Sequence, residues 1–234
     1  MKTIGLIGGM SWESTIPYYR IINETVKERL GGLHSAKIIL YSVEFDEIEK
    51  CQASGEWDKS ASILSDAAKK LELAGADFII ICTNTMHKVA GQIQAEINIP
   101  IVHIADATAD ELLKDNLSKV ALLGTRYTMT QDFYKEKLIN RGINVIIPDE
   151  ADVEIINHII FNELCVGIIC EESREKYKEI IKKLKDAGAE GVILGCTEIG
   201  LLIHQEDSVL KVFDTTEIHA KKAAEKALDT NHDK

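Results

Sequence analysis

The chain has 234 residues, of which 45% are hydrophobic and 28% are charged, and its formal net charge is −11. These proportions are typical of a globular domain, and no stretch approaches the run of about 20 apolar residues that a membrane span needs. The acidic balance argues against nucleic-acid binding, which requires clustered Lys and Arg, and five scattered cysteines argue against a secreted disulfide framework. We therefore expect a cytoplasmic protein whose partner is a small molecule, not a nucleic acid or a membrane.

Short β-branched segments alternate along the chain with longer segments of helical periodicity. This alternation is typical of a parallel sheet built from βαβ units, so the predicted fold class is α/β. The predicted strands cover residues 4–8, 37–43, 78–82, 99–103, 119–124, 144–147, 191–195 and 210–213. The predicted helices cover residues 14–30, 57–74, 106–115, 130–141, 152–164, 173–187 and 216–228.

An internal repeat divides the chain into two similar parts. Residues 69–85 (KKLELAGADFIIICTNT) align without a gap on residues 182–198 (KKLKDAGAEGVILGCTE), with seven of seventeen positions identical and an offset of 113. Residues 4–9 run parallel to residues 120–125 at an offset of 116. Two matches in the same order predict two pseudo-symmetric Rossmann-like halves with parallel sheets, and an active site in the cleft between them. We expect the halves to cover residues 1–100 and 101–209, with the segment 210–234 packing back on the first half.

The repeat pairs Thr83 with Cys196, and each residue follows a predicted buried strand. Ligands of parallel sheets bind beyond the carboxyl ends of the strands, so both residues are expected to face a ligand. Inversion of a stereocentre requires two proton-handling groups, because one removes the α-proton and the other supplies a proton to the opposite face. A cysteine thiolate can serve as the base, and we expect a helix N-terminus to favour its ionisation.

Three segments resemble the aspartate/glutamate racemase family: GGMSWEST at residues 8–15, CTNTMH at 82–87 and LGCTE at 194–198. The segment VEFDEIE at residues 43–49, with Gln52, Gly55 and Trp57, is similar to another part of the family, and the resemblance extends over essentially the whole chain. It implies two Rossmann-like halves, a homodimer, and racemisation of an amino acid without pyridoxal phosphate or any other cofactor. The residues themselves contain no Cys-x2-Cys pair and no close histidine motif, so no metal site is expected.

The chain departs from the usual family pattern at one position. The family has Cys-Asn-Thr in its first half, so its first catalytic cysteine corresponds to Thr83. Neighbouring residues of a strand point to opposite faces, and we therefore expect Cys82 to be a packed core thiol. A threonine hydroxyl can donate a proton, but its alkoxide is too basic to act as an ordinary base. We predict that Cys196 is the base and Thr83 the proton donor on the opposite face, so that conversion runs chiefly from L to D.

Further residues are expected from the resemblance to line the substrate site, mainly by holding the substrate carboxylate: Met10, Gln52, Asn84, Thr85, Thr125, Thr197 and Glu198. From the residues alone, Gln52 fits a solvated helix end equally well, and Thr125 fits an N-cap or a turn. His87 is expected to be a capping or core histidine, and Trp12 a packing residue. Residues 163–167 lack the lysine that many aspartate racemases have there, and Arg126 is the nearest basic residue to a predicted ligand loop. Side-chain specificity could accordingly be broader than aspartate and glutamate.

Two other functions fit the same residues. One is a decarboxylase or isomerase of a small dicarboxylate that uses a single cysteine. The other is a non-catalytic protein that binds carboxylates. Deuterium incorporation at Cα without loss of carbon dioxide would separate the racemase from the first, and any exchange at all would separate it from the second.

Overall fold

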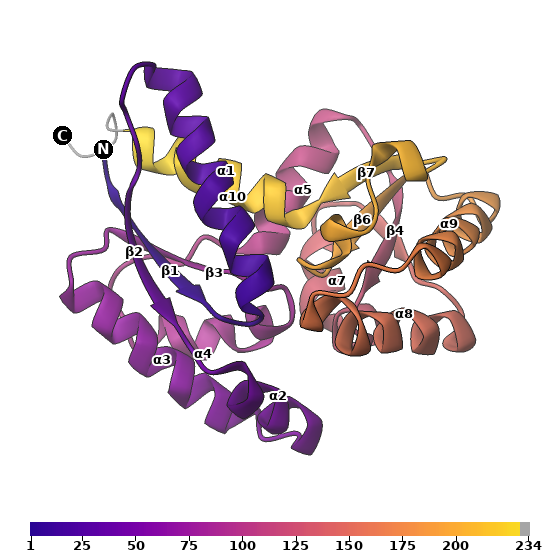
Figure 1. Ribbon diagram of the computed structural model, residues 1–234, viewed down its shortest axis with the longest axis horizontal. Helices are drawn as coiled ribbons and strands as arrows, with labels where there is room; N and C mark the ends of the chain where they lie inside the picture. The colour runs from indigo at the N-terminus through magenta and orange to yellow at the C-terminus, as the bar shows by residue number, and fades with distance from the viewer. Residues whose placement is uncertain (230–234) are drawn as a thin grey trace. The chain divides into compact units, whose positions relative to one another are not determined.

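The computed structural model describes residues 1–229, so the last five residues of the predicted segment 210–234 lie outside the described residues. The chain divides into two compact units, one formed by residues 1–104 together with the chain from His219 onward, and the other by Ala105–Ile218. Each unit contains one parallel sheet accompanied by helices (Figure 1). The predicted α/β fold class is therefore confirmed.

The first unit contains a three-stranded sheet of order β2-β1-β3. Its elements are β1 (Thr3–Gly8), α1 (Trp12–Leu30), β2 (Lys37–Ser42), α2 (Phe45–Ser54), α3 (Trp57–Leu73), β3 (Phe78–Ile81), the short 3-10 helix η1 (Thr85–Val89) and α4 (Ala90–Gln94).

The second unit contains a four-stranded sheet of order β5-β4-β6-β7. Its elements are α5 (Ile104–Lys114), β4 (Lys119–Gly124), α6 (Arg126–Thr130), α7 (Asp132–Ile139), β5 (Asn144–Ile146), α8 (Glu150–Asn162), η2 (Leu164–Val166), α9 (Glu171–Asp186), β6 (Gly191–Gly195), η3 (Ile199–Leu201), η4 (Gln205–Asp207) and β7 (Lys211–Asp214). Helix α10 (Thr215–Leu228) follows β7 and returns the chain to the first unit.

Strands β1 and β3 of the first sheet are buried on both faces, as their consecutive apolar residues predict. Leu6 of β1 and Ile80 of β3 pack in one core cluster with residues of α1 and α10. Ile7 and Ile81, the next residues of the same strands, pack in a second cluster with residues of α3 and α4. The side chains thus alternate between two helical layers, as the period of a strand requires.

The second sheet packs its β4 and β6 side chains against α8 and α9. Leu123, Leu194 and Cys196 share one cluster with Ile156 of α8 and Tyr177 of α9. Cys196 therefore continues the inward-facing row of β6 beyond the end of the strand.

The internal repeat of the sequence has a direct structural counterpart. Strand β1 pairs with β3 in the register Ile4 to Phe78, and β4 pairs with β6 in the register Val120 to Gly191. These are equivalent pairs under the offsets of 116 and 113. The carboxylate of Glu190 accepts a hydrogen bond from the Lys119 backbone N–H, just as the equivalent Asp77 carboxylate accepts one from Thr3. The two units therefore contain the same arrangement of two paired parallel strands.

The boundaries of the units differ from the expected residue numbers. The structure divides the chain at Ile104 and Ala105 and again at Ile218 and His219, where the sequence suggested 100/101 and 209/210. Strand β7, at the start of the segment expected to return, pairs with β6 in the second sheet. The residues that join the first core lie on α10 and are alanines: Ala220, Ala223, Ala224 and Ala227.

One predicted strand is absent, one predicted helix begins later than expected, and α2 is among the helices that were not predicted. Residues 99–103 form no strand and contribute a single bridge from Ile101 to Ile79, since Pro100 has no N–H for a ladder. The predicted helix 130–141 begins only at Asp132, because Gln131 is extended and separates α7 from α6. Helix α2 was not predicted, although Glu44 marks its start by accepting hydrogen bonds from the backbone N–H groups of Asp46 and Glu47.

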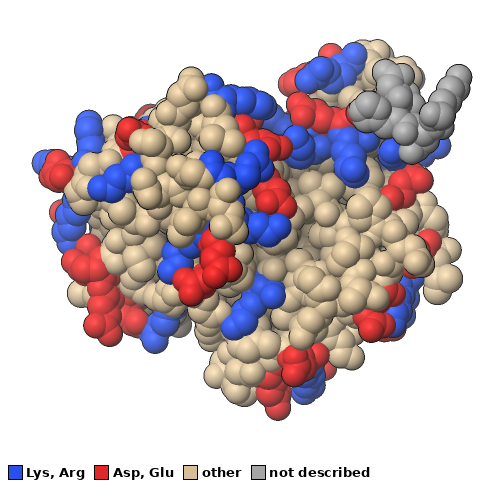
Figure 2. Space-filling view, turned by 180° about the vertical axis from the view of Figure 1, so that it is seen from behind, with Lys and Arg blue, Asp and Glu red and all other residues tan. Residues whose placement is uncertain are grey.

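The charged side chains of the surface are interspersed. Figure 2 shows Lys and Arg beside Asp and Glu over the face in view, and many of them form exposed ion pairs such as Lys70 with Asp66. No helix within residues 1–229 is both long enough and apolar enough to cross a membrane.

Candidate functional site

In the loop that follows β3, the backbone N–H and the backbone carbonyl of Thr83 both form hydrogen bonds. The Thr83 N–H donates to the Ile81 carbonyl at 2.8 Å, and the Thr83 carbonyl accepts from Nδ1 of His87 at 2.8 Å. Thr83, Asn84 and Thr85 are all buried, with exposed fractions of 9%, 1% and 4%. The loop is therefore ordered by backbone contacts while its short polar side chains stay within the protein.

Cys82 points away from this loop into the core, as predicted. Its side chain is fully buried in the cluster shared by α1 and α10, whereas Met86 lies in the cluster shared by α3 and α4. Burial raises the pKa of the Cys82 thiol well above its ordinary value. Cys82 is thus an inert packing thiol.

Gln52 lies against the Thr83 loop instead of in solvent. It belongs to α2, is only 5% exposed, and its Nε2 lies 3.0 Å from the sulfur of Met86. Met10, from the loop after β1, is buried in the same core cluster as Met86. The structure therefore brings Gln52 to the methionine that follows Thr83–Thr85 in sequence and buries Met10 in the same core cluster. The reading of Gln52 as a solvated helix-end residue was wrong.

The loop after β1 requires a glycine at position 9. Gly9 has φ of +89°, and a Cβ there would lie 2.3 Å from the Val43 carbonyl oxygen. Its N–H donates to Thr15 Oγ1 at 2.8 Å, and Thr15 Oγ1 in turn donates to the Ser11 carbonyl at 2.8 Å. Trp12 begins α1 on the outward side and is 62% exposed, so its predicted packing role was wrong.

The loop that follows β6 contains a thiol and a carboxylate in contact. The Cys196 thiol donates to Glu198 Oε2 at 3.0 Å, and the Thr197 hydroxyl donates to the same oxygen at 2.9 Å. All three side chains are buried, and Glu198 is only 2% exposed. A buried carboxylate beside a thiol can accept the thiol proton, so Cys196 and Glu198 can act as an acid–base couple.

The Cys196 thiol is held in its protonated form. Burial raises its pKa well above the ordinary value, and the negative charge of Glu198 raises it further. The expectation that a helix N-terminus makes the thiol ionise readily is not met. The Glu198 backbone N–H does lower the pKa, but burial and the Glu198 carboxylate raise it by more. A thiolate at Cys196 therefore requires that its proton move to another group.

Tyr177 was missed by sequence reasoning. Its hydroxyl is buried without a hydrogen-bond partner among residues 1–229, and burial raises its pKa, with a further contribution from the neighbouring Cys196. Tyr177 lies on α9, where helical periodicity predicts only a buried aromatic residue. No local sequence signal could have placed it beside a thiol that follows β6.

Thr125 follows β4, the strand adjacent to β6, and Gly124 pairs with Gly195. The Thr125 hydroxyl caps α6 by accepting a hydrogen bond from the Thr128 N–H, so the N-cap reading describes its local role. Arg126 forms an ion pair with Glu154 of α8, and its side chain is half-exposed. The basic residue nearest to this loop is therefore already paired with a carboxylate.

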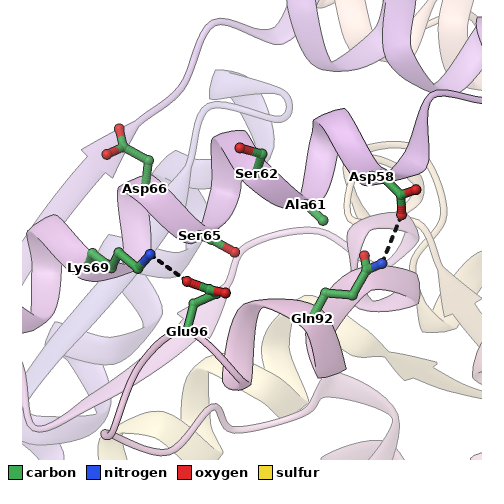
Figure 3. Close-up of a pocket in the computed structure, with 8 residues that line it drawn as sticks. All are labelled: Asp58, Ala61, Ser62, Ser65, Asp66, Lys69, Gln92 and Glu96. Carbon is green, nitrogen blue, oxygen red and sulfur yellow. Dashed lines mark hydrogen bonds and ion pairs between the residues drawn. The ribbon is translucent and has the colours of Figure 1, made fainter.

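A groove of about 570 Å³ lies elsewhere in the first unit, between α3 and α4. Figure 3 shows that two contacts bridge it, from Lys69 to Glu96 and from Gln92 to Asp58. None of the predicted site residues lines it. Most of its charged lining residues are acidic, and these two contacts already connect its two sides. We therefore interpret the groove as part of the packing between α3 and α4.

Comparisons with known proteins identify a family of similar sequence and fold. The family model described as Asp/Glu/Hydantoin racemase matches residues 7–223. A solved structure from Pyrococcus horikoshii, described as an aspartate racemase homologue, is 43% identical with a TM-score of 0.84, covering 97% of this chain and 99% of that one. A structure from Yersinia pestis, named for the Asp/Glu racemases, is 58% identical with a TM-score of 0.90, covering 97% of this chain and 100% of that one. A broad-specificity amino-acid racemase of Bacillus subtilis is 24% identical over 93% of this chain and 95% of its own length.

Proposed function

The chain belongs to the Asp/Glu/hydantoin racemase family, and on that premise we propose that it is a cofactor-independent racemase of a free amino acid of the aspartate/glutamate type. The observation that carries the proposal is the buried Cys196 thiol hydrogen-bonded to Glu198, at the position that the repeat makes equivalent to Thr83. An acid–base couple and a hydroxyl at equivalent positions suit a reaction that handles protons on two faces of one carbon.

The reaction proceeds by two proton transfers at the α-carbon. The Cys196 thiol first gives its proton to the Glu198 carboxylate, and the resulting thiolate removes the α-proton of the L-amino acid. Positioned N–H and hydroxyl donors stabilise the carbanion in a water-poor site. The Thr83 hydroxyl then donates a proton to the opposite face and water returns a proton to the Thr83 oxygen. The hydroxide so formed takes up the proton held by Glu198, which restores the starting protonation states.

The two directions of this reaction are unequal. Threonine is a poor base because its alkoxide forms only at very high pH, whereas it can serve as a donor. Removal of the α-proton from the D-amino acid would need Thr83 as the base. At saturating substrate the L-enantiomer therefore turns over faster than the D-enantiomer. Because the equilibrium constant of racemisation is 1, kcat/KM is the same for both enantiomers, and their KM values differ in the same proportion as kcat.

Binding of the substrate carboxylate falls to short polar groups of the two loops. Asn84 and Thr85 in the first unit and Thr125 and Thr197 in the second follow strand ends, the edge at which parallel sheets bind their ligands. Gln52 contacts Met86, which follows the Thr83 loop, and Met10 is buried in the same cluster as Met86. We assign these six residues to substrate binding.

The side-chain specificity is broader than aspartate and glutamate. A strict acidic specificity calls for a cation that pairs with the distal carboxylate, and Arg126 is already paired with Glu154. Broad specificity is also the description of the Bacillus subtilis relative.

The enzyme acts as a homodimer. Helix α1 carries three large apolar residues on one exposed side: Trp12 is 62% exposed, and Ile16 and Tyr19 are each 57% exposed. Exposed apolar residues gathered on one helix favour contact with another protein surface.

The proposed function is tested by initial rates from both enantiomers. In heavy water, L-aspartate and L-glutamate should exchange the α-proton and yield the D-enantiomer. At saturating concentration the kcat of the D-enantiomers should be lower by about tenfold or more, since threonine is the weaker base. Equal kcat values from both hands would contradict the assignment of Thr83. Release of carbon dioxide would instead favour a decarboxylase, and binding without any exchange would favour a carboxylate-binding protein.

Substitution of Glu198 by Gln should make the Cys196 thiol ionise more readily and yet lower the rate of racemisation. The amide removes the negative charge beside the thiol, so the pKa of Cys196 falls and iodoacetamide alkylates it at lower pH. Racemisation falls by about 10²-fold or more, because the amide cannot accept the thiol proton. Mass spectrometry of the peptide that contains Cys196 follows alkylation against pH. The exposed Glu206→Gln should change neither property, and an unshifted alkylation profile in Glu198→Gln would refute the couple.

A further inference from the structure

Three histidines and a tyrosine form a buried group in the first unit. We call Tyr18, His87, His103 and His219 the histidine cluster. The centroid of the His87 ring lies 4.5 Å from that of His103 and 5.6 Å from that of His219. The centroid of the Tyr18 ring lies 5.7 Å from that of His219. Tyr18, His87 and His219 are 3% exposed or less. Within the described part of the chain, these residues do not form a group that could hold a metal ion.

The hydrogen bonds of His87 determine where its proton lies. Nδ1 is 2.8 Å from the Thr83 carbonyl, which can only accept, so Nδ1 carries the proton. Nε2 is 3.2 Å from the Ile104 backbone N–H, which can only donate, so Nε2 is unprotonated. His87 is therefore neutral and in the Nδ1–H form, which suits both partners at once.

His219 has the opposite form for the same kind of reason. Its Nε2 is 2.8 Å from the Val102 carbonyl and must carry the proton. Its Nδ1 therefore accepts from the Tyr18 hydroxyl at 3.0 Å. Burial lowers the pKa of His219 to about 4 and that of His87 well below its ordinary value, so both rings stay neutral near pH 7.

The histidine cluster lies at the two points where the chain leaves the first unit and where it returns to it. The chain leaves this unit after Ile104 and returns at His219. Ile104 donates to His87, and the Val102 carbonyl accepts from His219. One end of His87 thus holds the departing segment, and the other end holds the carbonyl of Thr83.

We propose that His87 is a positioning residue for Thr83, tying the proton-donor loop to the segment where the chain leaves the first unit. This inference rests on the proposed function. With the Thr83 N–H bonded to Ile81 and its carbonyl bonded to His87, the backbone at this residue has one orientation. The β-branched side chain has few χ1 rotamers, so the His87 bond sets the direction of the Thr83 hydroxyl.

The matched variants His87→Asn and His87→Gln separate the two bonds of the ring. The Asn amide nitrogen can reach the place of Nδ1 and donate to the Thr83 carbonyl, but it leaves the Ile104 N–H unbonded. The Gln amide oxygen can reach the place of Nε2 and accept from Ile104, but it leaves the Thr83 carbonyl without its donor. Both variants lose one buried hydrogen bond, so thermal unfolding should show comparable destabilisation.

The readout is the ratio of inversion to α-proton exchange, measured with L-substrate in heavy water. Cys196 alone supports exchange, whereas inversion also needs a well-placed Thr83. His87→Gln should lower the ratio by roughly tenfold or more, because small misplacements of a reacting group are costly, and His87→Asn should stay within about threefold of the parent protein. A general loss of packing would lower both rates together and leave the ratio unchanged. An unchanged ratio in His87→Gln would overturn the proposal.

A measurement on the parent protein keeps the proposal testable if the variants fail to fold. Long-range ¹H–¹⁵N spectra of the parent protein labelled with ¹⁵N-histidine should show a neutral histidine of the Nδ1–H form. A parent protein whose buried histidines are all of the Nε2–H form would refute the bond to Thr83. Failure of the proposed function is recognised separately, because the parent protein would then show no inversion of any amino acid.

Discussion

Replacing Cys196 with alanine should abolish racemisation, with turnover lowered by at least about 10³-fold. Alanine leaves the Glu198 carboxylate in place but removes the group that takes the α-proton, and no other thiol can substitute. In heavy water, α-proton exchange of the L-amino acid should disappear together with inversion. Circular dichroism of the substrate and ¹H NMR of its α-proton measure the two rates in one sample.

Cys82→Ala is the matched control for this experiment. Cys82 precedes the donor residue Thr83 in sequence, but its thiol is fully buried in the core beneath α1 and α10. Its removal should lower the stability of the fold and leave kcat within about threefold of the parent protein, as expected for a group that takes no part in proton transfer. Activity that survives in Cys196→Ala and vanishes in Cys82→Ala would reverse the assignment of the base.

Replacing Thr83 with cysteine should give the enzyme a second base. A thiol ionises many orders of magnitude more readily than a threonine hydroxyl, so removal of the α-proton from the D-amino acid becomes possible. The rate from D to L should rise by about tenfold or more and approach the rate from L to D. Initial rates from each pure enantiomer measure this directly, with Thr83→Ser as the control that keeps a hydroxyl.

Thr83→Ala should separate exchange from inversion. Without the hydroxyl, inversion of the L-amino acid should fall by about 10²-fold, while exchange of its α-proton continues because Cys196 and Glu198 are intact. A D-to-L rate that stays low in Thr83→Cys, together with unimpaired inversion in Thr83→Ala, would show that another group supplies the proton.

The fold followed from the sequence wherever the hydrophobic pattern was unambiguous. The consecutive apolar residues of β1, β3, β4 and β6 are each buried between helical layers, and strands of this kind are recognisable by composition. The segment 99–103 has a similar composition but forms only a bridge. Propensity cannot distinguish a strand from an extended connection when a proline interrupts the ladder.

The pairing of Thr83 with Cys196 was a property of the sequence alone, and so was the orientation of Cys82 toward the core. The pairing came from the internal repeat, and the orientation of Cys82 came from the two-residue period of a strand. Both patterns can be read directly from the sequence. The packing of Gln52 was not accessible in this way, because the sulfur beside Gln52 belongs to Met86, 34 residues away.

The chemical state of the candidate base was decided only by the tertiary structure. The sequence placed a cysteine after a buried strand, and a helix N-terminus beside it was expected to favour ionisation of its thiol. The fold instead surrounds Cys196 with an apolar cluster and the Glu198 carboxylate, and both raise its pKa. The same holds for His87, whose proton is placed by the Thr83 carbonyl and the Ile104 N–H. Residue type and spacing therefore determined which groups meet, whereas desolvation and hydrogen-bond direction, which depend on packing from distant segments, determined where their protons lie.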